Sequence, residues 1–359
     1  MEKHKEKRPT SSFSPVLPAK SDPDVPGRQC GNRPIRWTAG RLKRILFLLL
    51  QVMISTALLV LLFRGFDWSR FLSAMSGVPL SFYLYALCLN FFCQLLYVWK
   101  WSTVLRSLEV RAPFSYLVWA FFVGFFFANF LPTSAGQDVA RVYYAGRRWG
   151  YLRIGSSVFM DRALSFFAMI FLAAILVTCL GPQVFAFQSV RNTLVFLFIG
   201  CLCLLGATQL PVQRWAVGVA ERFPALSAWA EGFGHTAGYA RSVGASPSVL
   251  LPSVLLVALS FGIMTHVYME YFGIIGTPDV DTISVYTALL IITAISNLPI
   301  ALNGIGVREQ AHYLFFSALG VSKEIAVAIS LLLFSQALLF GVLGLLLWTV
   351  GESGRRRNR

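Results

Sequence analysis

The sequence predicts an all-α protein that crosses a membrane several times. Hydrophobic residues make up 56% of its 359 residues and charged residues 13%, whereas soluble domains carry about 25% charged residues. The mean hydropathy is +0.65, and several apolar runs reach the roughly 20 residues that a helix needs to cross a bilayer. Because a spanning segment must satisfy its own backbone hydrogen bonds, runs of this length are expected to be helices.

Eight apolar segments can be separated along the chain. Six are long enough for full spans, and two shorter ones end in Leu-Pro. The full spans are expected at residues 42–63, 80–99, 155–180, 192–210, 249–272 and 325–349, and the shorter segments cover residues 114–130 and 284–300. Since proline lacks a backbone donor and disfavours the helical conformation of the residue before it, each shorter helix should end at its Leu-Pro.

The net charge of +15 is concentrated at the two ends of the chain and in some loops. Residues 1–44 hold eleven Lys and Arg residues, and the chain ends in GRRRNR. Basic flanks of membrane spans usually stay in the cytoplasm. We therefore expect a protein of the cell (inner) membrane with both termini cytoplasmic. Residues 1–40 should form a disordered basic tail, and residues 351–359 a second basic tail.

The charges of the loops predict that neither short segment crosses the membrane. The loop expected after residues 80–99 begins with Lys100, and the loop expected after residues 114–130 contains Arg141. Both loops are basic and should be cytoplasmic, so the segment between them has to enter the membrane and return as a re-entrant hairpin. The second short segment must also return if the C-terminus is cytoplasmic.

The two halves of the membrane region then have the same order of segments and opposite orientations. The halves cover residues 41–181 and 191–350, and each reads as span, span, re-entrant hairpin, span. Such an inverted repeat is the architecture of many secondary transporters. Residues 211–247 are expected to insert a cytoplasmic pair of amphipathic helices into the second half, with a short soluble loop as the alternative.

The two hairpins carry related motifs. "NFLPTSAGQDVAR" begins at Asn129 and "NLPIALNGIGVRE" at Asn297, 168 residues later. In each motif an arginine follows the proline by nine residues. Glycine permits backbone shapes and close approaches that other residues resist. The residues expected to shape the hairpins are Pro132, Gly136, Pro299, Gly304 and Gly306.

A broken helix at membrane depth can form a polar binding site. A helix that restarts after the break directs free N–H groups and a partial positive charge into the gap, and an arginine beside them suits a phosphate or carboxylate. The expected substrate-binding residues are Asn129, Gln137, Asp138, Arg141, Asn297, Asn303, Arg308 and Glu309. Salt bridges that merely hold the hairpins together are the alternative for the charged residues.

The spacing of these charges suggests particular partners. Asp138 precedes Arg141 by three residues, so on a helix the two share a face and can pair. Glu309 directly follows Arg308, so it is expected to point elsewhere, toward Arg141 or Asp138.

Several further polar residues in apolar segments are secondary candidates. His266 and Glu270 are four residues apart and share a helical face, which suits either a proton relay or a packed pair. Asp161 and Arg162 lie early in their span, where an interfacial structural role is the simpler interpretation. His312 lies one turn past Arg308.

No motif of a known catalytic or cofactor site accompanies these residues. The six cysteines form no CxxC pair and no metal-ligand spacing. The sequence has no P-loop, HExxH, GxSxG or dinucleotide fingerprint, and no nucleic-acid-binding motif accompanies the basic charge. We therefore expect no metal, no cofactor, no catalytic residue and no nucleic-acid partner.

The motifs "NFLPTSAGQDVARVYYA", "SSVFMDRAL" and "NLPIALNGIGVREQA" resemble the flippase-like transmembrane domain of the lysylphosphatidylglycerol synthase family over about residues 40–350. The resemblance implies movement of a polar lipid or lipid-linked sugar between leaflets. It also implies that the hairpin prolines, glycines and charges, with Asp161 and Arg162, follow the family pattern, whereas Gln137 stands where glycine is common. The soluble aminoacyl-transfer domain of full synthases is not expected here, so the chain should not make a lysyl-lipid.

Three functions remain open from the sequence. The first is lipid translocation by alternating access, with an anionic head group between the hairpins. The second is an intramembrane lipid-modifying enzyme that uses Asp138, Glu309 or His266 for acid–base chemistry. The third is a non-catalytic membrane partner that recruits a lipid-modifying enzyme through residues 211–247.

Overall fold

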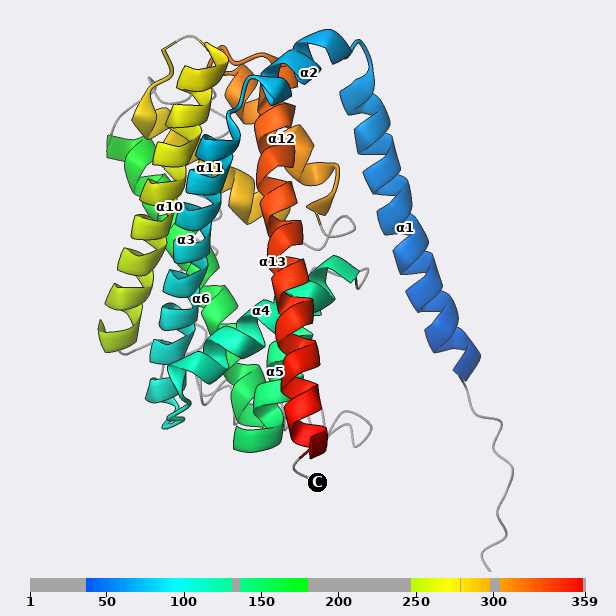
Figure 1. Cartoon of the computed structure of the whole chain (residues 1–359), viewed down its shortest axis with the longest axis vertical. Coiled ribbons are helices and arrows are strands. Elements are labelled where there is room, and N and C mark those ends of the chain that lie inside the picture. Colours follow the sequence, from blue (N-terminus) through cyan, green and yellow to red (C-terminus); the bar gives the residue numbers. More distant parts are fainter. Residues whose placement is uncertain (1–36, 131–135, 180–246, 278, 298–303, 358–359) are drawn as a thin grey trace, which may run out of the picture. The chain divides into compact units, whose positions relative to one another are not determined.

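The computed structural model describes residues 37–130, 136–179, 247–277, 279–297 and 304–357. Every regular element in these ranges is an α-helix (Figure 1). The helices are α1 (Trp37–Phe63), α2 (Trp68–Ser76), α3 (Leu80–Ser107), α4 (Phe114–Phe130), α5 (Gly136–Trp149), α6 (Tyr151–Cys179), α10 (Pro247–Ile275), α11 (Thr282–Ser296), α12 (Val307–Ser317) and α13 (Lys323–Arg357). The expected all-α membrane class is confirmed for the described part of the chain.

Four of these helices are long and apolar enough to cross a membrane: α3, α6, α10 and α13. The segment Leu49–Phe63 together with α2 is a fifth candidate, although the two helices are bent by 94° at their junction. Asp67 begins α2, because its carboxylate accepts hydrogen bonds from the backbone N–H groups of Ser69 and Arg70, as an N-cap residue does. The expected span at 192–210 and the expected insert at 211–247 lie outside the described residues.

The boundary of the second span was predicted wrongly. The sequence predicts that this span ends at residue 99 and that Lys100 lies in a loop, but α3 continues to Ser107 and Lys100 is only 1% exposed. The helix tolerates the buried ammonium group because Asp161 on α6 pairs with it at 2.9 Å.

The two shorter apolar segments form helices that pack against the helix that follows each of them. α4 packs on α5, and α11 packs on α12. Pro132, Pro299 and Asn303 lie outside the described residues. Gly304 and Gly306 have φ values of +74° and +86°, which non-glycine residues rarely adopt.

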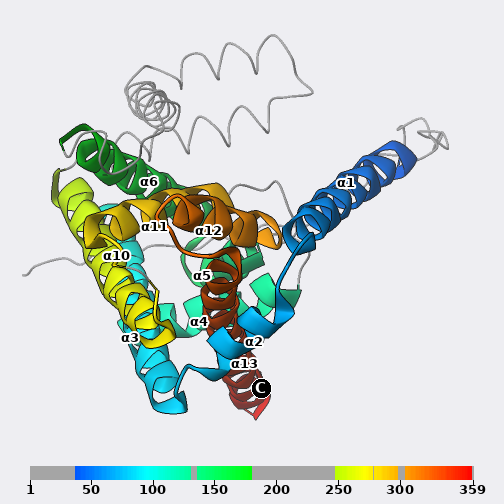
Figure 2. The same cartoon turned by 90° about the horizontal axis from the view of Figure 1, so that it is seen from above.

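Helices of the first half pack against helices of the second half. α3 and α10 run antiparallel, since Phe82 stacks edge-on against Tyr271 and the Cys93 thiol meets the Ser260 carbonyl oxygen further along. Figure 2 shows α3 beside α10, α11 beside α6 and α4 beside α13, and all three pairs are in contact. The α4–α13 contact is close, because a side chain on Gly344 would overlap the backbone of Phe122.

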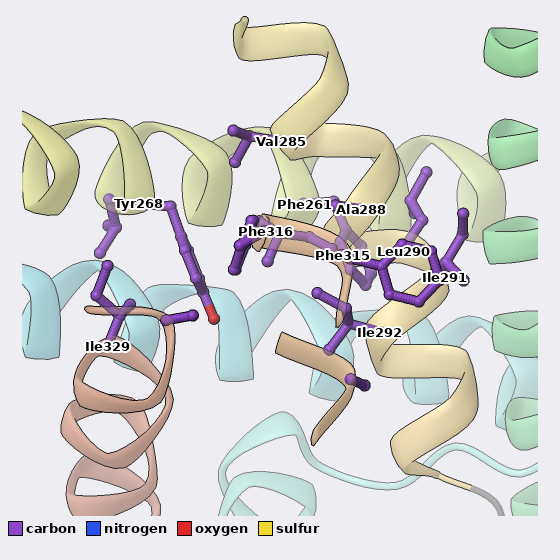
Figure 3. Close-up of a cluster of buried hydrophobic side chains, with 14 of the residues drawn as sticks. Phe261, Tyr268, Val285, Ala288, Leu290, Ile291, Ile292, Phe315, Phe316 and Ile329 are labelled. Carbon is purple, nitrogen blue, oxygen red and sulfur yellow. The ribbon is translucent and has the colours of Figure 1, made fainter. Parts of the chain in front are cut away.

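The largest buried apolar cluster lies where α10, α11 and α12 meet α3, α6 and α13. Phe261 and Tyr268 of α10, Leu290 of α11 and Phe316 of α12 meet in this cluster (Figure 3). Burial of side chains of this size stabilises a fold by about 1.5–3 kcal/mol each relative to water. In a membrane the comparable contribution comes from close packing. The cluster holds the second hairpin against the long helices and so fixes the position of α12.

Candidate functional site

A cavity of about 380 Å³ is lined by residues from both halves of the chain. Side chains of α3, α4, α5, α6, α10, α11, α12 and α13 contribute to its wall. Its polar and charged lining residues are Asn90, Gln94, Tyr97, Asn129, Gln137, Arg162, Ser260, Tyr268, Thr293, Ser296, Asn297, Arg308, His312 and Ser330. The described residues that line it include two arginines and no aspartate or glutamate.

A smaller cavity of about 200 Å³ adjoins the first. Gln94, Gln137, Arg162 and Asn297 are among the residues that line both. The smaller cavity is also lined by Lys100, Arg141 and Asp161.

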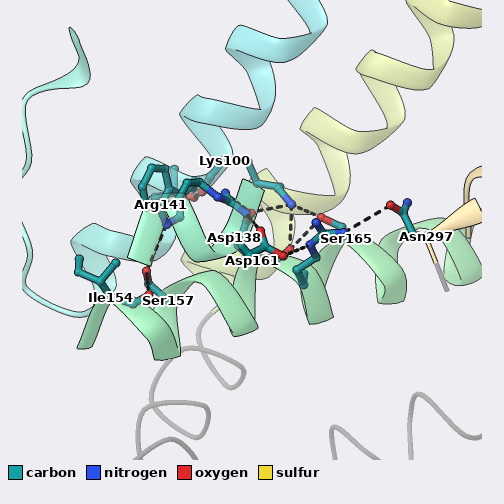
Figure 4. Close-up of polar contacts among 11 residues, drawn as sticks. Lys100, Asp138, Arg141, Ile154, Ser157, Asp161, Ser165 and Asn297 are labelled. Atoms are coloured by element: carbon teal, nitrogen blue, oxygen red, sulfur yellow. Dashed lines mark hydrogen bonds and ion pairs between the residues drawn. The ribbon is translucent and has the colours of Figure 1, made fainter. Parts of the chain in front are cut away.

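An alternating row of charges crosses the first half beside these cavities (Figure 4). Lys100 Nζ lies 2.9 Å from Asp161 Oδ1, and Asp161 Oδ2 lies 3.2 Å from Arg141 Nη1. Arg141 Nη2 is 2.5 Å from Asp138 Oδ1, and Asp138 Oδ2 is 2.7 Å from Arg162 Nε. We call these five residues the ion row. With every group ionised it contains three cations and two anions, so it carries one unbalanced positive charge.

The ion row connects three helices. Lys100 belongs to α3, Asp138 and Arg141 to α5, and Asp161 and Arg162 to α6. The expected Asp138–Arg141 pairing is present at the i, i+3 spacing. Asp161 is buried between two cations, Lys100 and Arg141. Breaking such a buried arrangement is costly because it leaves a charge without a partner.

The Arg141 guanidinium is fixed by two salt bridges and two aromatic rings. Its side chain is 3% exposed, and its guanidinium carbon lies 4.9 Å from the ring centre of Trp101 and 5.4 Å from that of Phe121. Attraction between a cation and an aromatic face adds to the two salt bridges. Arg141 lines the smaller cavity, whereas Arg162 and Arg308 both line the larger one.

The second hairpin pairs its charges locally. Arg308 Nη2 lies 2.6 Å from Glu309 Oε1, and Glu309 Oε2 accepts the backbone N–H of Gly306 at 2.7 Å. The expectation that Glu309 points toward Arg141 or Asp138 is wrong. The carboxylate turns back to the free N–H group at the start of α12, and this brings its other oxygen beside Arg308. The Arg308 guanidinium also lies over the Phe334 ring at 4.5 Å.

His312 is buried next to Arg308 and lines the larger cavity. Its Nδ1 lies 2.8 Å from the Arg308 carbonyl oxygen, which can only accept, so Nδ1 carries a proton. Nε2 lies 2.7 Å from the Tyr268 hydroxyl, and in a neutral ring it accepts a hydrogen bond from that hydroxyl. His266 and Glu270 are exposed on α10, where His266 contacts the Tyr85 hydroxyl at 3.1 Å. Neither of these two residues lines the cavities described above.

Sequence reasoning missed several residues that the fold brings to this site. Lys100, Asn90 and Gln94 all lie on α3. The Asn90 amide donates a hydrogen bond to Gln336 and accepts one from Gln94. The available signal was the spacing of Asn90 and Gln94, which are four residues apart inside an apolar span. Polar residues on one face of a membrane helix usually point to the interior of the bundle.

Within the described ranges, no cluster of three or more His, Cys, Asp or Glu residues could hold a metal ion.

Comparison with known proteins identifies the family. Residues 48–344 match the family model described as the lysylphosphatidylglycerol synthase TM region, and no curated protein matches the chain. The matched range contains α2 to α12 and most of α13, and with them the ion row and both cavities. The chain is a multi-span membrane protein that belongs to the family of the lysylphosphatidylglycerol synthase transmembrane region.

Proposed function

We propose that this protein moves an anionic polar lipid between the two leaflets of the cell membrane by alternating access. One observation carries the proposal: the larger cavity presents two arginines, Arg162 and Arg308, and no acidic residue among its described lining. A phosphate finds charge-assisted donors on this wall. A lysyl ammonium group finds no carboxylate there.

The remaining lining groups also suit a lipid head group. Gln137 Nε2 is buried and has no hydrogen-bond partner among the described residues, so it can donate to a phosphate or hydroxyl oxygen. Asn297 and Thr293 lie on the same wall. Charged groups cost about 2.5–3.5 kcal/mol at the centre of a bilayer on insertion scales. The polar lining lowers this cost for a head group, while the hydrocarbon chains stay in the bilayer.

The packing of the helices supports an inverted repeat. If α3, α4, α5 and α6 are exchanged with α10, α11, α12 and α13 in order, the contact of α4 with α5 becomes that of α11 with α12. In the same way α5–α6 becomes α12–α13, and α4–α13 becomes α11–α6, and each of these pairs is in contact. In Figure 1, α3 descends from α2 while its counterpart α10 ascends.

An inverted repeat gives a simple mechanism for transport. Two halves of opposite orientation can rock against each other and expose the site between them to each face in turn. In our proposal the substrate site is the larger cavity, which residues of both halves line. In our proposal both termini are cytoplasmic, as the basic tails suggest.

Reconstitution tests this function directly. The purified full chain is placed in phosphatidylcholine vesicles that contain a trace of fluorescent phosphatidylglycerol, and a membrane-impermeant quencher is added outside. We expect the inner-leaflet probe to become accessible faster than in protein-free vesicles. We also expect a fluorescent lipid with a cationic head group to move more slowly, since the arginines repel it. A rate equal to that of protein-free vesicles for every probe would contradict the proposal.

A further inference from the structure

A third hollow of about 520 Å³ opens on the outer side of α5 and α6. We call it the outer groove. Its lining is mainly apolar and consists of Val139, Val142, Tyr143, Tyr151, Gly155, Val158 and Phe159, together with Asp138 and Arg162. Val139, Tyr151 and Phe159 are each more than half exposed. Apolar side chains exposed on the surface of a membrane protein are suited to contact with hydrocarbon chains.

Arg162 connects the outer groove with the interior. It lines the outer groove and both inner cavities, and its partner Asp138 lines the outer groove. The Asp138–Arg162 ion pair therefore forms part of the wall between the groove and the binding cavity. Its side chains are 20% and 29% exposed, whereas Lys100 is 1% exposed and Arg141 3% exposed. The Asp138–Arg162 pair is therefore the most solvent-accessible ion pair of the ion row.

We propose that an anionic phospholipid enters the cavity sideways, between α5 and α6, by displacing Asp138 from Arg162; this rests on the transport function proposed above. The acyl chains then occupy the outer groove, and the phosphate binds the guanidinium group of Arg162. The apolar surface of the groove suits the hydrocarbon chains of a lipid, and the cation Arg162 suits its anionic head group.

The exchange of partners leaves no buried charge alone. When Asp138 leaves Arg162 it still pairs with Arg141 at 2.5 Å. The phosphate supplies the negative charge that the ion row lacks, so three cations then face three anions. Arg162 Nη1 reaches Asn297 at 3.4 Å, and Asn297 lies on the wall of the larger cavity. A phosphate on Arg162 can therefore pass inward toward Arg308.

Filling the outer groove tests this route. Gly155 lines the groove, and a Cβ built on it meets nothing within 4 Å. Gly155→Trp is expected to fill the groove and reduce the movement of fluorescent phosphatidylglycerol to the protein-free rate. Gly262→Trp is the matched control, because Gly262 is a helical glycine on α10 with equally open space, and it should retain the wild-type rate.

The outcome separates the route from the function. If wild-type protein moves the probe and Gly155→Trp moves it equally fast, sideways access is overturned while the proposed function stands. If wild-type protein does not move the probe, the proposed function itself fails.

A binding measurement tests the exchange at Arg162. Titration of detergent-solubilised protein with phosphatidylglycerol should show tighter binding for Asp138→Asn, because the competing carboxylate is gone, and weaker binding for Arg162→Gln. Each shift in the dissociation constant should be roughly tenfold or more, since a hydrogen bond between charged groups is gained or lost. A merely structural role of the pair predicts lower melting temperatures without tighter binding. Weaker binding by Asp138→Asn would overturn the exchange.

Discussion

Replacement of Asp161 by alanine is expected to destabilise the protein by roughly 3–5 kcal/mol, the usual cost of removing one partner of a buried ion pair. Asp161 is 7% exposed and is the shared partner of Lys100 and Arg141. Without it, Lys100 loses its carboxylate and Arg141 retains only Asp138. The expected result is a large fall in melting temperature, measured by the fraction of protein that remains monodisperse in detergent after heating.

A second substitution distinguishes charge from packing as the cause. Lys100→Met removes the cation that Asp161→Ala leaves without a carboxylate, so the double variant should be more stable than Asp161→Ala alone. Arg153→Ala serves as the surface control on the same helix, because Arg153 is exposed, and it should melt with the wild type. A double variant no more stable than Asp161→Ala would show that the ion row does not hold these helices as described.

Replacement of Arg308 by alanine is expected to abolish measurable lipid movement. Arg308 lines the larger cavity, and 22% of its side chain is exposed there. Removal of its charged hydrogen bonds to an anionic head group should weaken binding roughly ten- to hundredfold. The rate of phosphatidylglycerol movement in reconstituted vesicles measures the effect, with Arg153→Ala as the control.

The paired carboxylate needs a control of its own. Glu309 is only 3% exposed, so Arg308→Ala leaves a buried carboxylate without its cation. A loss of stability could then be mistaken for a loss of binding. The double variant Arg308→Gln/Glu309→Gln keeps the pair neutral overall. It should retain the wild-type melting temperature and still fail to move the lipid. Wild-type transport by this variant would remove Arg308 from the binding site.

The positions of the described membrane helices could be predicted from the sequence, because they depend on apolar runs and local breaks. Residues 249–272 and 325–349 lie within α10 and α13, and the two Leu-Pro segments gave short helices as expected. The end of α3 at Ser107, beyond Lys100, could not be predicted from the apolar run. A lysine after an apolar run usually marks the end of a span, and only the contact with Asp161, 61 residues away in the chain, explains why the helix continues.

The hairpin motifs predicted several residues that line the larger cavity, among them Asn129, Asn297 and Arg308, but not the way in which the charged side chains pair. The matching positions of Arg141 and Arg308 suggested that both face one cavity. In the structure Arg141 is enclosed by Asp138, Asp161 and aromatic rings, and Arg162 faces the cavity instead. The two halves have the same order of helices, but the ion pairs of their arginines differ. Arg141 pairs with Asp138 and Asp161, whereas Arg308 pairs with Glu309.

Access to the cavity from both faces of the membrane is the most direct test of the proposed mechanism. Ser296 lines the larger cavity and is partly exposed, so Ser296→Cys can report access in a variant whose six native cysteines are replaced. A membrane-impermeant thiol reagent is applied to one face of reconstituted vesicles and then, in a separate sample, to the other. Alternating access predicts labelling of this cysteine from either face. Labelling from one face alone, in protein that is correctly folded and oriented, would contradict it.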